Sequence, residues 1–185
     1  MGRSRLAVSF GAKLDLDLVV GEDAPRASEA LVVAQDVNLI MGEVDAVLES
    51  TETTDQVLTD CSDSRPRRAG TLVVAPARDG QPVLLQAVVY DFDRSPPTKA
   101  AHVFEALVLA FEEAKRRGFG CLAIRPVGTA YSGLEPVVFL RLLTQICYSS
   151  AELGTSVRRV HLLLPSPGEM AVYEVLLQGM MRKRG

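Results

Sequence analysis

Residues 128–133 read GTAYSG and combine two glycines with small and hydroxylated side chains. They follow the apolar run GCLAI at residues 120–124 and precede Pro136, a residue favoured at the first position of a helix. Backbone amides at a helix N-terminus attract anions, and glycine lets a phosphate group come close to the chain. The stretch therefore predicts either a phosphate-binding loop or a plain strand-to-helix turn, because paired glycines also serve simply to turn a chain.

Two related loop chemistries lack the residues that they need. The two glycines have the separation of a Walker motif, but Leu134 and Glu135 stand where lysine and serine or threonine are required. A hydrolase nucleophile elbow needs glycine two residues before the serine, and Ala130 precedes Ser132 instead. The sequence therefore argues against nucleotide triphosphate hydrolysis and against a serine hydrolase of this type.

Histidine and cysteine usage gives no metal site and no cofactor. His102 and His161 belong to no metal-binding motif, and His161 lies in an apolar strand, where a structural role is expected. Cys121 and Cys147 lie among apolar residues and are expected in the core, whereas Cys61 lies in a polar stretch. Three unpaired thiols and an N-terminus without a signal-peptide pattern favour a cytoplasmic location.

The elements that would position these residues follow from hydrophobic periodicity. Leu14, Leu16 and Leu18 alternate with aspartates, which is typical of a strand with one buried face. Asp79 and Gly80 predict a hairpin turn between two further strands. The expected strands cover residues 6–10, 13–21, 29–36, 71–77, 82–92, 120–128 and 158–165. The expected helices cover residues 37–50, 97–117, 136–151 and 167–180.

Alternation of strands and helices predicts a three-layer α/β/α sandwich with a mixed, mostly parallel central sheet. The 185 residues suit one domain spanning 1–185, with 48% hydrophobic residues and a net charge of −3. That charge argues against a nucleic-acid partner, and no apolar run is long enough to cross a membrane. Ligands of such sheets bind beyond the carboxyl ends of the strands, where the loops after residues 36 and 124 qualify.

Two separated stretches resemble the macro-domain family. ALVVAQDVNLIMGEVDAVLE, at residues 30–49, is similar to the family segment A-I-V-N-A-A-N followed by G-G-G-V-D and a helix. GFGCLAIRPVGTAYSGLEP, at residues 118–136, is similar to the segment in which a strand ends in G-T-G-[VI]-[YF]-G and F-P. The resemblance covers roughly residues 5–181 and implies a macro-domain fold with a cleft for ADP-ribose at the strand ends.

The resemblance also implies roles for individual residues. Glu22 falls where the family contacts the adenine amine, and Asp36 falls where it contacts the distal ribose. Asp45 matches an aspartate that follows the first loop. The two ligand-binding loops that it implies consist of Gly42, Glu43 and Val44, and of Gly128, Thr129, Ala130, Tyr131, Ser132 and Gly133.

Several positions depart from the family pattern. Val33 and Asp36 replace the two asparagines, and Glu43 replaces a glycine of the first loop. In the second loop Ala130 replaces a glycine, and Ser132 replaces an aromatic residue. Each change removes hydrogen bonds or adds negative charge near a diphosphate, at about 1–3 kcal/mol per lost buried contact. Affinity for a nucleotide is therefore expected to be lower than the family pattern implies.

Three functions remain open from the sequence. The first is binding of ADP-ribose or a related nucleotide, which the retained second loop favours. The second is a protein-interaction or assembly module with a decayed pocket and a protein partner, which the acidic, glycine-poor first loop favours. The third is hydrolysis of ADP-ribosyl esters with Asp36 or Asp45 as the base. The loss of the orienting asparagine and of the glycine-rich loop favours binding over catalysis.

Overall fold

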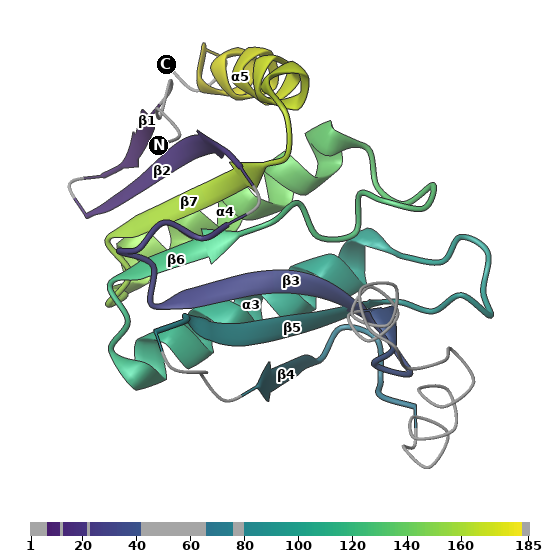
Figure 1. Cartoon of the computed structure of the whole chain (residues 1–185). Coiled ribbons are helices and arrows are strands. Elements are labelled where there is room, and N and C mark those ends of the chain that lie inside the picture. The colour runs from purple at the N-terminus through teal and green to yellow at the C-terminus, as the bar shows by residue number, and fades with distance from the viewer. Residues whose placement is uncertain (1–6, 12, 22, 42–65, 76–79, 183–185) are drawn as a thin grey trace.

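The computed structural model of the chain describes residues 7–11, 13–21, 23–41, 66–75 and 80–182. Within these ranges one seven-stranded sheet has the order β1-β2-β7-β6-β3-β5-β4 (Figure 1). The strands are β1 (Ala7–Phe10), β2 (Leu14–Val20), β3 (Ala30–Asp36), β4 (Leu72–Ala75), β5 (Val83–Tyr90), β6 (Cys121–Ile124) and β7 (Arg159–Leu164). The inner strands run parallel, and β1 and β4 run antiparallel at the edges. The predicted α/β/α class with a mixed, mostly parallel sheet is confirmed.

Both edges of the sheet are antiparallel pairs, and the sequence predicted the hairpin at the β4–β5 edge. β1 pairs with β2 through residues such as Phe10 and Leu14, and β4 pairs with β5. Gly80 has a left-handed backbone with φ of 75°, which suits the predicted turn, while Asp79 lies outside the described residues. The alternation along β2 is also confirmed, because its leucines are buried and its aspartates lie on the opposite face.

Helices α3 (Ala100–Arg117) and α4 (Pro136–Leu153) lie behind the sheet in Figure 1 and pack against each other. The predicted apolar stripe of α3 is buried, and Gly118 ends this helix in the left-handed conformation with φ of 73°. The helix begins at Ala100 rather than at the expected Pro97, because Lys99 has an extended backbone. At the start of α4, Phe139 is buried but Val137 is only half-buried, so burial is confined to one side of the helix.

Helix α5 (Pro167–Arg182) packs against β2, β7 and α4. Ser166 caps the N-terminus of this helix, since its hydroxyl oxygen accepts a hydrogen bond from the Glu169 amide at 3.2 Å. Tyr173 is buried, and its ring packs edge-on against Phe139. Most of the helix expected over residues 37–50 lies outside the described residues, as does Cys61.

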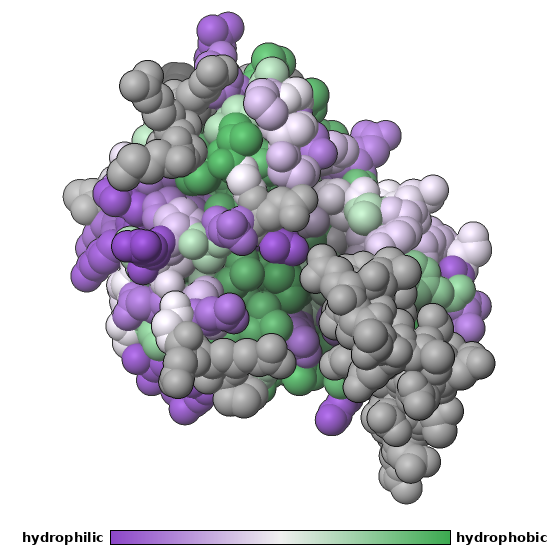
Figure 2. All heavy atoms as spheres, in the orientation of Figure 1, coloured by the Kyte–Doolittle hydropathy of each residue, from purple (hydrophilic) through white to green (hydrophobic). Residues whose placement is uncertain are grey.

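The sheet has chemically distinct ends. Figure 2 shows hydrophobic side chains gathered at the centre of the face turned toward the viewer, with hydrophilic side chains on the left, near the amino ends of the parallel strands. The carboxyl ends lie on the right, where the expected ligand loops leave the sheet (Figure 1). None of the helices in the described ranges is long and apolar enough to cross a membrane.

Candidate functional site

The two loops that the sequence singled out leave neighbouring parallel strands at the same edge of the sheet. β3 pairs with β6, so that Val32 lies opposite Ile124, and the amide of Arg125 donates to the carbonyl of Val32 at 3.0 Å. β5 lies on the other side of β3 and carries Tyr90 opposite Asp36. Loop 128–133, the turn after β3 and the end of β5 therefore form one candidate site at the carboxyl edge.

Loop 128–133 has a backbone that requires glycine at both ends. A Cβ atom on Gly133 would lie 2.1 Å from the carbonyl oxygen of Gly128, which is far inside van der Waals contact. Gly128 has φ of 78°, and a Cβ there would lie 2.5 Å from a methyl group of Val103 on α3. The amide of Gly133 donates to the Ala130 carbonyl at 2.9 Å, and the amide of Leu134 donates to the Gly128 carbonyl at 2.7 Å. The loop is therefore closed on itself and fixed in shape.

At the tip of this loop two backbone amides have no acceptor among the described residues. Tyr131 and Ser132 both have left-handed backbones, with φ of 53° and 57°. This conformation costs a residue other than glycine about 1–2 kcal/mol. Within the part of the chain that the structure describes, their amides have no hydrogen-bond acceptor. Successive free amides in a turn form a concave anion site. The strained tip is therefore chemically suited to an anionic group.

Tyr90 ties the same loop to the sheet. Its hydroxyl accepts a hydrogen bond from the Ala130 amide at 2.9 Å and donates to the Ala130 carbonyl at 3.2 Å. Burial raises the pKa of Tyr90 to about 12, so the hydroxyl keeps the proton that it donates. The Ala130 amide is consequently already used within the protein. Sequence reasoning missed Tyr90, although an aromatic residue at the carboxyl end of a buried strand was a usable signal.

Three aromatic rings meet beside the loop. Tyr90 stacks on Phe92 with ring centroids 5.5 Å apart, and the ring of Tyr131 packs edge-on against both. Tyr90 is fully buried, but Phe92 and Tyr131 are 51% and 62% exposed. The carboxyl edge therefore presents an exposed pair of aromatic rings, Phe92 and Tyr131, supported from below by Tyr90.

Asp36 shapes the turn after β3. Its carboxylate accepts hydrogen bonds from the amides of Asn38, Ile40 and Met41 at 2.7, 3.0 and 2.8 Å, and the residue is 1% exposed. Gln35 accepts a second bond from the Met41 amide at 2.9 Å. A carboxylate has about four acceptor positions, and three are already occupied here. Asp36 therefore holds the backbone of this turn, and its predicted contact with a ribose remains a prediction.

Five predicted residues lie outside the described part of the chain: Glu22, Gly42, Glu43, Val44 and Asp45. The structure therefore describes the second of the two predicted loops and none of the first, although it describes the turn that leads to it. Among the described residues, no group of three or more histidine, cysteine or acidic side chains could hold a metal ion.

A cleft of about 630 Å³ lies next to this site, beside the turn after β3 and the end of β5. Its lining includes Arg67, Arg68 and Arg94. Arg94 lies 2.8 Å from Asp91, and Arg68 lies 3.3 Å from Glu105. Among the described residues, Arg67 is the lining arginine without a carboxylate partner, so the edge offers this guanidinium group as well as the amides of loop 128–133.

Both the sequence and the structure of the chain can be compared with known proteins. No family model matches the sequence, and no curated protein is similar to it. The structure is similar to the macrodomain of Oceanobacillus iheyensis with ADP, with a TM-score of 0.73 and 16% identity over 99% of both chains. It is also similar to the Trypanosoma brucei macrodomain in complex with ADP-ribose, with a TM-score of 0.61 and 14% identity over 86% of this chain and 68% of that one.

A third similar structure is the macro domain of ganglioside induced differentiation associated protein 2. Its TM-score is 0.60, with 12% identity over 86% of this chain and 82% of that chain. Identities this low establish a common architecture and carry no information about individual site residues. The chain therefore has the macrodomain fold.

Proposed function

We propose that the chain binds ADP-ribose or a related adenine nucleotide at the carboxyl edge of β3 and β6, with the diphosphate on loop 128–133. The observation that carries this proposal is the backbone of the loop. It has no space for a side chain at Gly133, and the amides of Tyr131 and Ser132 have no acceptor within the described residues. Such amides stabilise an anion without requiring lysine or arginine.

The fold comparison supports the class of ligand, and the sheet topology supports its place. Two of the similar macrodomains are described as structures with ADP and with ADP-ribose. In α/β sheets of this kind, ligands bind beyond the carboxyl ends of the strands, where the loop 128–133 lies. The exposed rings of Phe92 and Tyr131 offer a stacking surface for the sugar or base of the ligand.

A protein-interaction module is the second candidate, and one observation favours it. The polar groups of the edge are partly used inside the protein, because Tyr90 occupies the Ala130 amide and three amides occupy the Asp36 carboxylate. Beside them, Phe92 and Tyr131 expose apolar surface, which is typical of contacts with another protein. We do not extend the proposal to hydrolysis, since the Asp36 carboxylate already accepts three amides and Asp45 lies outside the described residues.

Isothermal titration with ADP-ribose, ADP and AMP at high protein concentration distinguishes the two candidates. Nucleotide binding predicts a measurable heat with ADP-ribose and ADP and a much smaller one with AMP, which lacks the diphosphate. An absence of heat up to millimolar ligand would refute nucleotide binding and leave the interaction module.

Two glycine variants locate the site. Gly133→Ala places a methyl group against the Gly128 carbonyl, and we expect it to weaken binding at least about tenfold, or about 1.4 kcal/mol. Gly179→Ala is the matched control, because a Cβ atom at Gly179 meets nothing within 4 Å. Thermal melting of both variants separates a loss of binding from a loss of folding. Equal affinity in both variants would show that loop 128–133 is not the site.

A further inference from the structure

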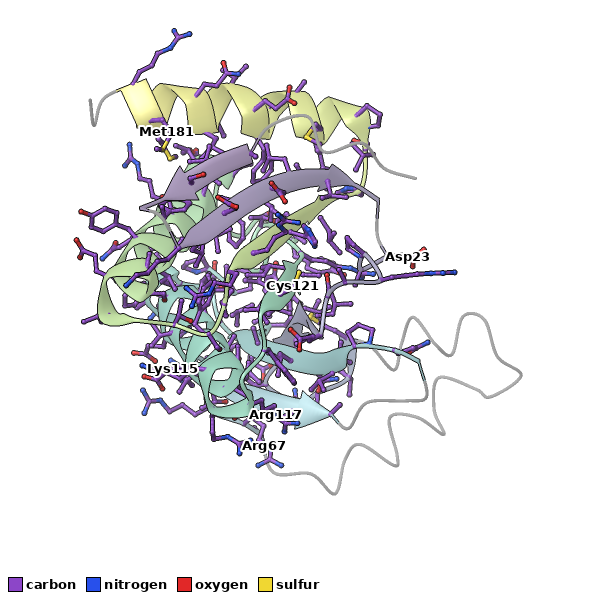
Figure 3. All side chains as sticks on the ribbon, turned by 90° about the vertical axis from the view of Figure 1, so that its left-hand side faces the viewer. Asp23, Arg67, Lys115, Arg117, Cys121 and Met181 are labelled. Carbon is purple, nitrogen blue, oxygen red and sulfur yellow. The ribbon has the colours of Figure 1, made fainter. Side chains whose placement is uncertain are left out.

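A second group of reactive side chains lies at the opposite end of the sheet. We call it the thiol cluster, and it consists of Asp17, Ser28, Cys121 and His161. Strand register brings it together, because His161 on β7 lies between Asp17 on β2 and Ala123 on β6. Figure 3 looks onto this end of the sheet, at the left of Figure 1, and shows Cys121 near its middle. The thiol cluster is thus remote from the carboxyl-edge site.

The imidazole of His161 is the centre of the cluster. Its Nδ1 atom lies 3.1 Å from the Ser28 hydroxyl and 3.6 Å from the Cys121 sulfur. Its Nε2 atom lies 3.7 Å from a carboxylate oxygen of Asp17. A carboxylate beside Nε2 favours the tautomer with the proton on Nε2, which leaves Nδ1 free to accept a proton. The ring is therefore oriented as a base toward the hydroxyl and the thiol.

Both partners are uncharged in the resting protein, and both pKa shifts keep the proton on the sulfur until attack on a disulfide begins. Burial lowers the pKa of His161, with a smaller opposing effect from Asp17, so the imidazole is neutral near pH 7. Burial raises the pKa of the Cys121 thiol, so the sulfur carries a proton until a base removes it. A protonated thiol beside a neutral imidazole is the starting arrangement for base-assisted nucleophilic attack.

Access and charge at this end of the sheet indicate what could react. Cys121 lines a cavity of about 420 Å³, together with Lys13, Asp15, Ala27, Arg158 and Arg159. Carboxylates lie beside these cations: Arg159 is 3.5 Å from Asp17, Glu29 accepts the amide of Cys121, and Asp15 accepts the Ser9 hydroxyl at 2.6 Å. Among the described residues, Lys13 and Arg158 are the two lining cations without a carboxylate partner, and they suit a reactant with carboxylate groups.

We propose that Cys121 is a nucleophilic thiol that forms a mixed disulfide with a small anionic disulfide, with His161 as its base and Asp17 as the positioning residue. In this step Nδ1 of His161 takes the thiol proton, and the Cys121 sulfur attacks one sulfur of the disulfide. A new S–S bond forms as the original one breaks, and the departing thiolate takes the proton from His161. One disulfide is consumed and one is formed, so no further oxidant is required.

Cys121 is a better candidate for the nucleophile than Ser28, because it is more accessible to solvent. Ser28 is 7% exposed and does not line the cavity, whereas Cys121 is more exposed and does. Cys147, the other cysteine in the described ranges, is fully buried in α4. A reagent from solvent therefore reaches Cys121 but not Cys147.

The reaction is tested with oxidised glutathione, a disulfide that carries several carboxylates. The protein for this test is the full chain with Cys61→Ala, which removes the cysteine outside the described ranges. Intact-mass spectrometry should show one adduct, located at Cys121 by peptide mapping and lost in Cys121→Ser. The folded protein should react about tenfold faster than the same protein unfolded in urea, because only the fold supplies the base and the cations. A folded rate equal to or below the unfolded rate would overturn the proposal.

Charge selectivity gives a second test that does not disturb the buried residues. Arg158→Glu should slow the reaction with oxidised glutathione about tenfold and leave the reaction with the neutral bis(2-hydroxyethyl) disulfide unchanged. Arg94→Glu, at the far edge of the sheet, is the matched control and should change neither rate. His161→Gln should slow both reagents equally, by about a hundredfold. If Arg158→Glu slowed both reagents alike, or neither, the proposed selectivity for anionic disulfides would be refuted.

Discussion

The hydroxyl of Tyr90 accepts a hydrogen bond from the amide of Ala130 at 2.9 Å and donates one back to the carbonyl of the same residue at 3.2 Å. One side chain of β5 thus satisfies both backbone groups at the tip of a loop forty positions later. Because the loop supports the proposed diphosphate site, the sheet and the site are mechanically coupled through this one phenol.

Tyr90→Phe should therefore weaken both stability and ligand binding. It keeps the ring but leaves the amide and carbonyl of Ala130 without their partner, at a cost of about 1–3 kcal/mol. Urea denaturation measures the loss of stability, and titration with ADP-ribose measures the loss of affinity. Tyr131→Phe is the control. Because the Tyr131 ring is exposed, we expect this variant to change the free energy of unfolding by less than about 0.5 kcal/mol.

Tyr90 should also make the protein sensitive to alkaline pH. Its folded pKa of about 12 lies above the ordinary value of 10.0, so burial favours the neutral phenol. The stability that this preference contributes is complete below pH 10 and is lost as the pH rises from 10 to 12. Burial raises the pKa of Tyr173 as well, so part of the alkaline loss belongs to α5.

Urea denaturation at pH 8, 10 and 11.5 measures this dependence. The alkaline loss should be smaller in Tyr90→Phe than in the natural sequence, because one of the two buried phenols is gone. An identical loss in both proteins would show that Tyr90 does not titrate with a raised pKa.

Asp36→Asn tests the role of the carboxylate in the turn after β3. An amide keeps one oxygen acceptor and replaces the other with a donor, which would face the amides that now donate to Asp36. We expect a loss of about 1–3 kcal/mol in the free energy of unfolding. Asp93→Asn makes the same chemical change at an exposed position and should have little effect. Equal effects of the two changes would contradict the capping role of Asp36.

Gly128→Ala should report how closely α3 approaches loop 128–133. The added Cβ atom meets both a left-handed backbone and a methyl group of Val103 at 2.5 Å. Gly80→Ala has a similar φ of 75° but meets nothing within 4 Å, so it measures the backbone cost alone, about 1 kcal/mol. The excess cost at Gly128 should shrink when Val103→Ala is added, in a double-mutant cycle measured by urea denaturation. Strict additivity would contradict the contact.

The strands and helices were predictable where local pattern determines them. Alternation along β2, the buried stripe of α3 and the left-handed Gly118 each depend on residues within a few positions of one another. The start of α3 was predicted three residues too early, at Pro97. Lys99 has an extended backbone, so the helix begins only at Ala100. Local patterns locate an element well but locate its ends less well.

The candidate site was predictable only in part. Loop 128–133 was recognised from its glycines, and the structure gives each of them a steric reason. The contribution of Tyr90 was not recognised from the sequence, because it depends on a contact between β5 and the loop that follows β6. The thiol cluster was missed for the same reason, since Ser28 and His161 are 133 positions apart in the sequence. Single-sequence patterns contain no information about such contacts.

The order of strands in the sheet has a consequence for how the chain acquires its structure. β2 pairs in parallel with β7, where Asp15 lies opposite Arg159. The ribosome therefore synthesises most of the chain after β2 before β7 is available. Until β7 emerges, the β1–β2 hairpin has no strand to join, and its buried leucines have no complete core. Pairings this distant form slowly and leave apolar surface open in the meantime. We expect nascent chains that stop before β7 to be the forms of this protein that chaperones and proteases meet.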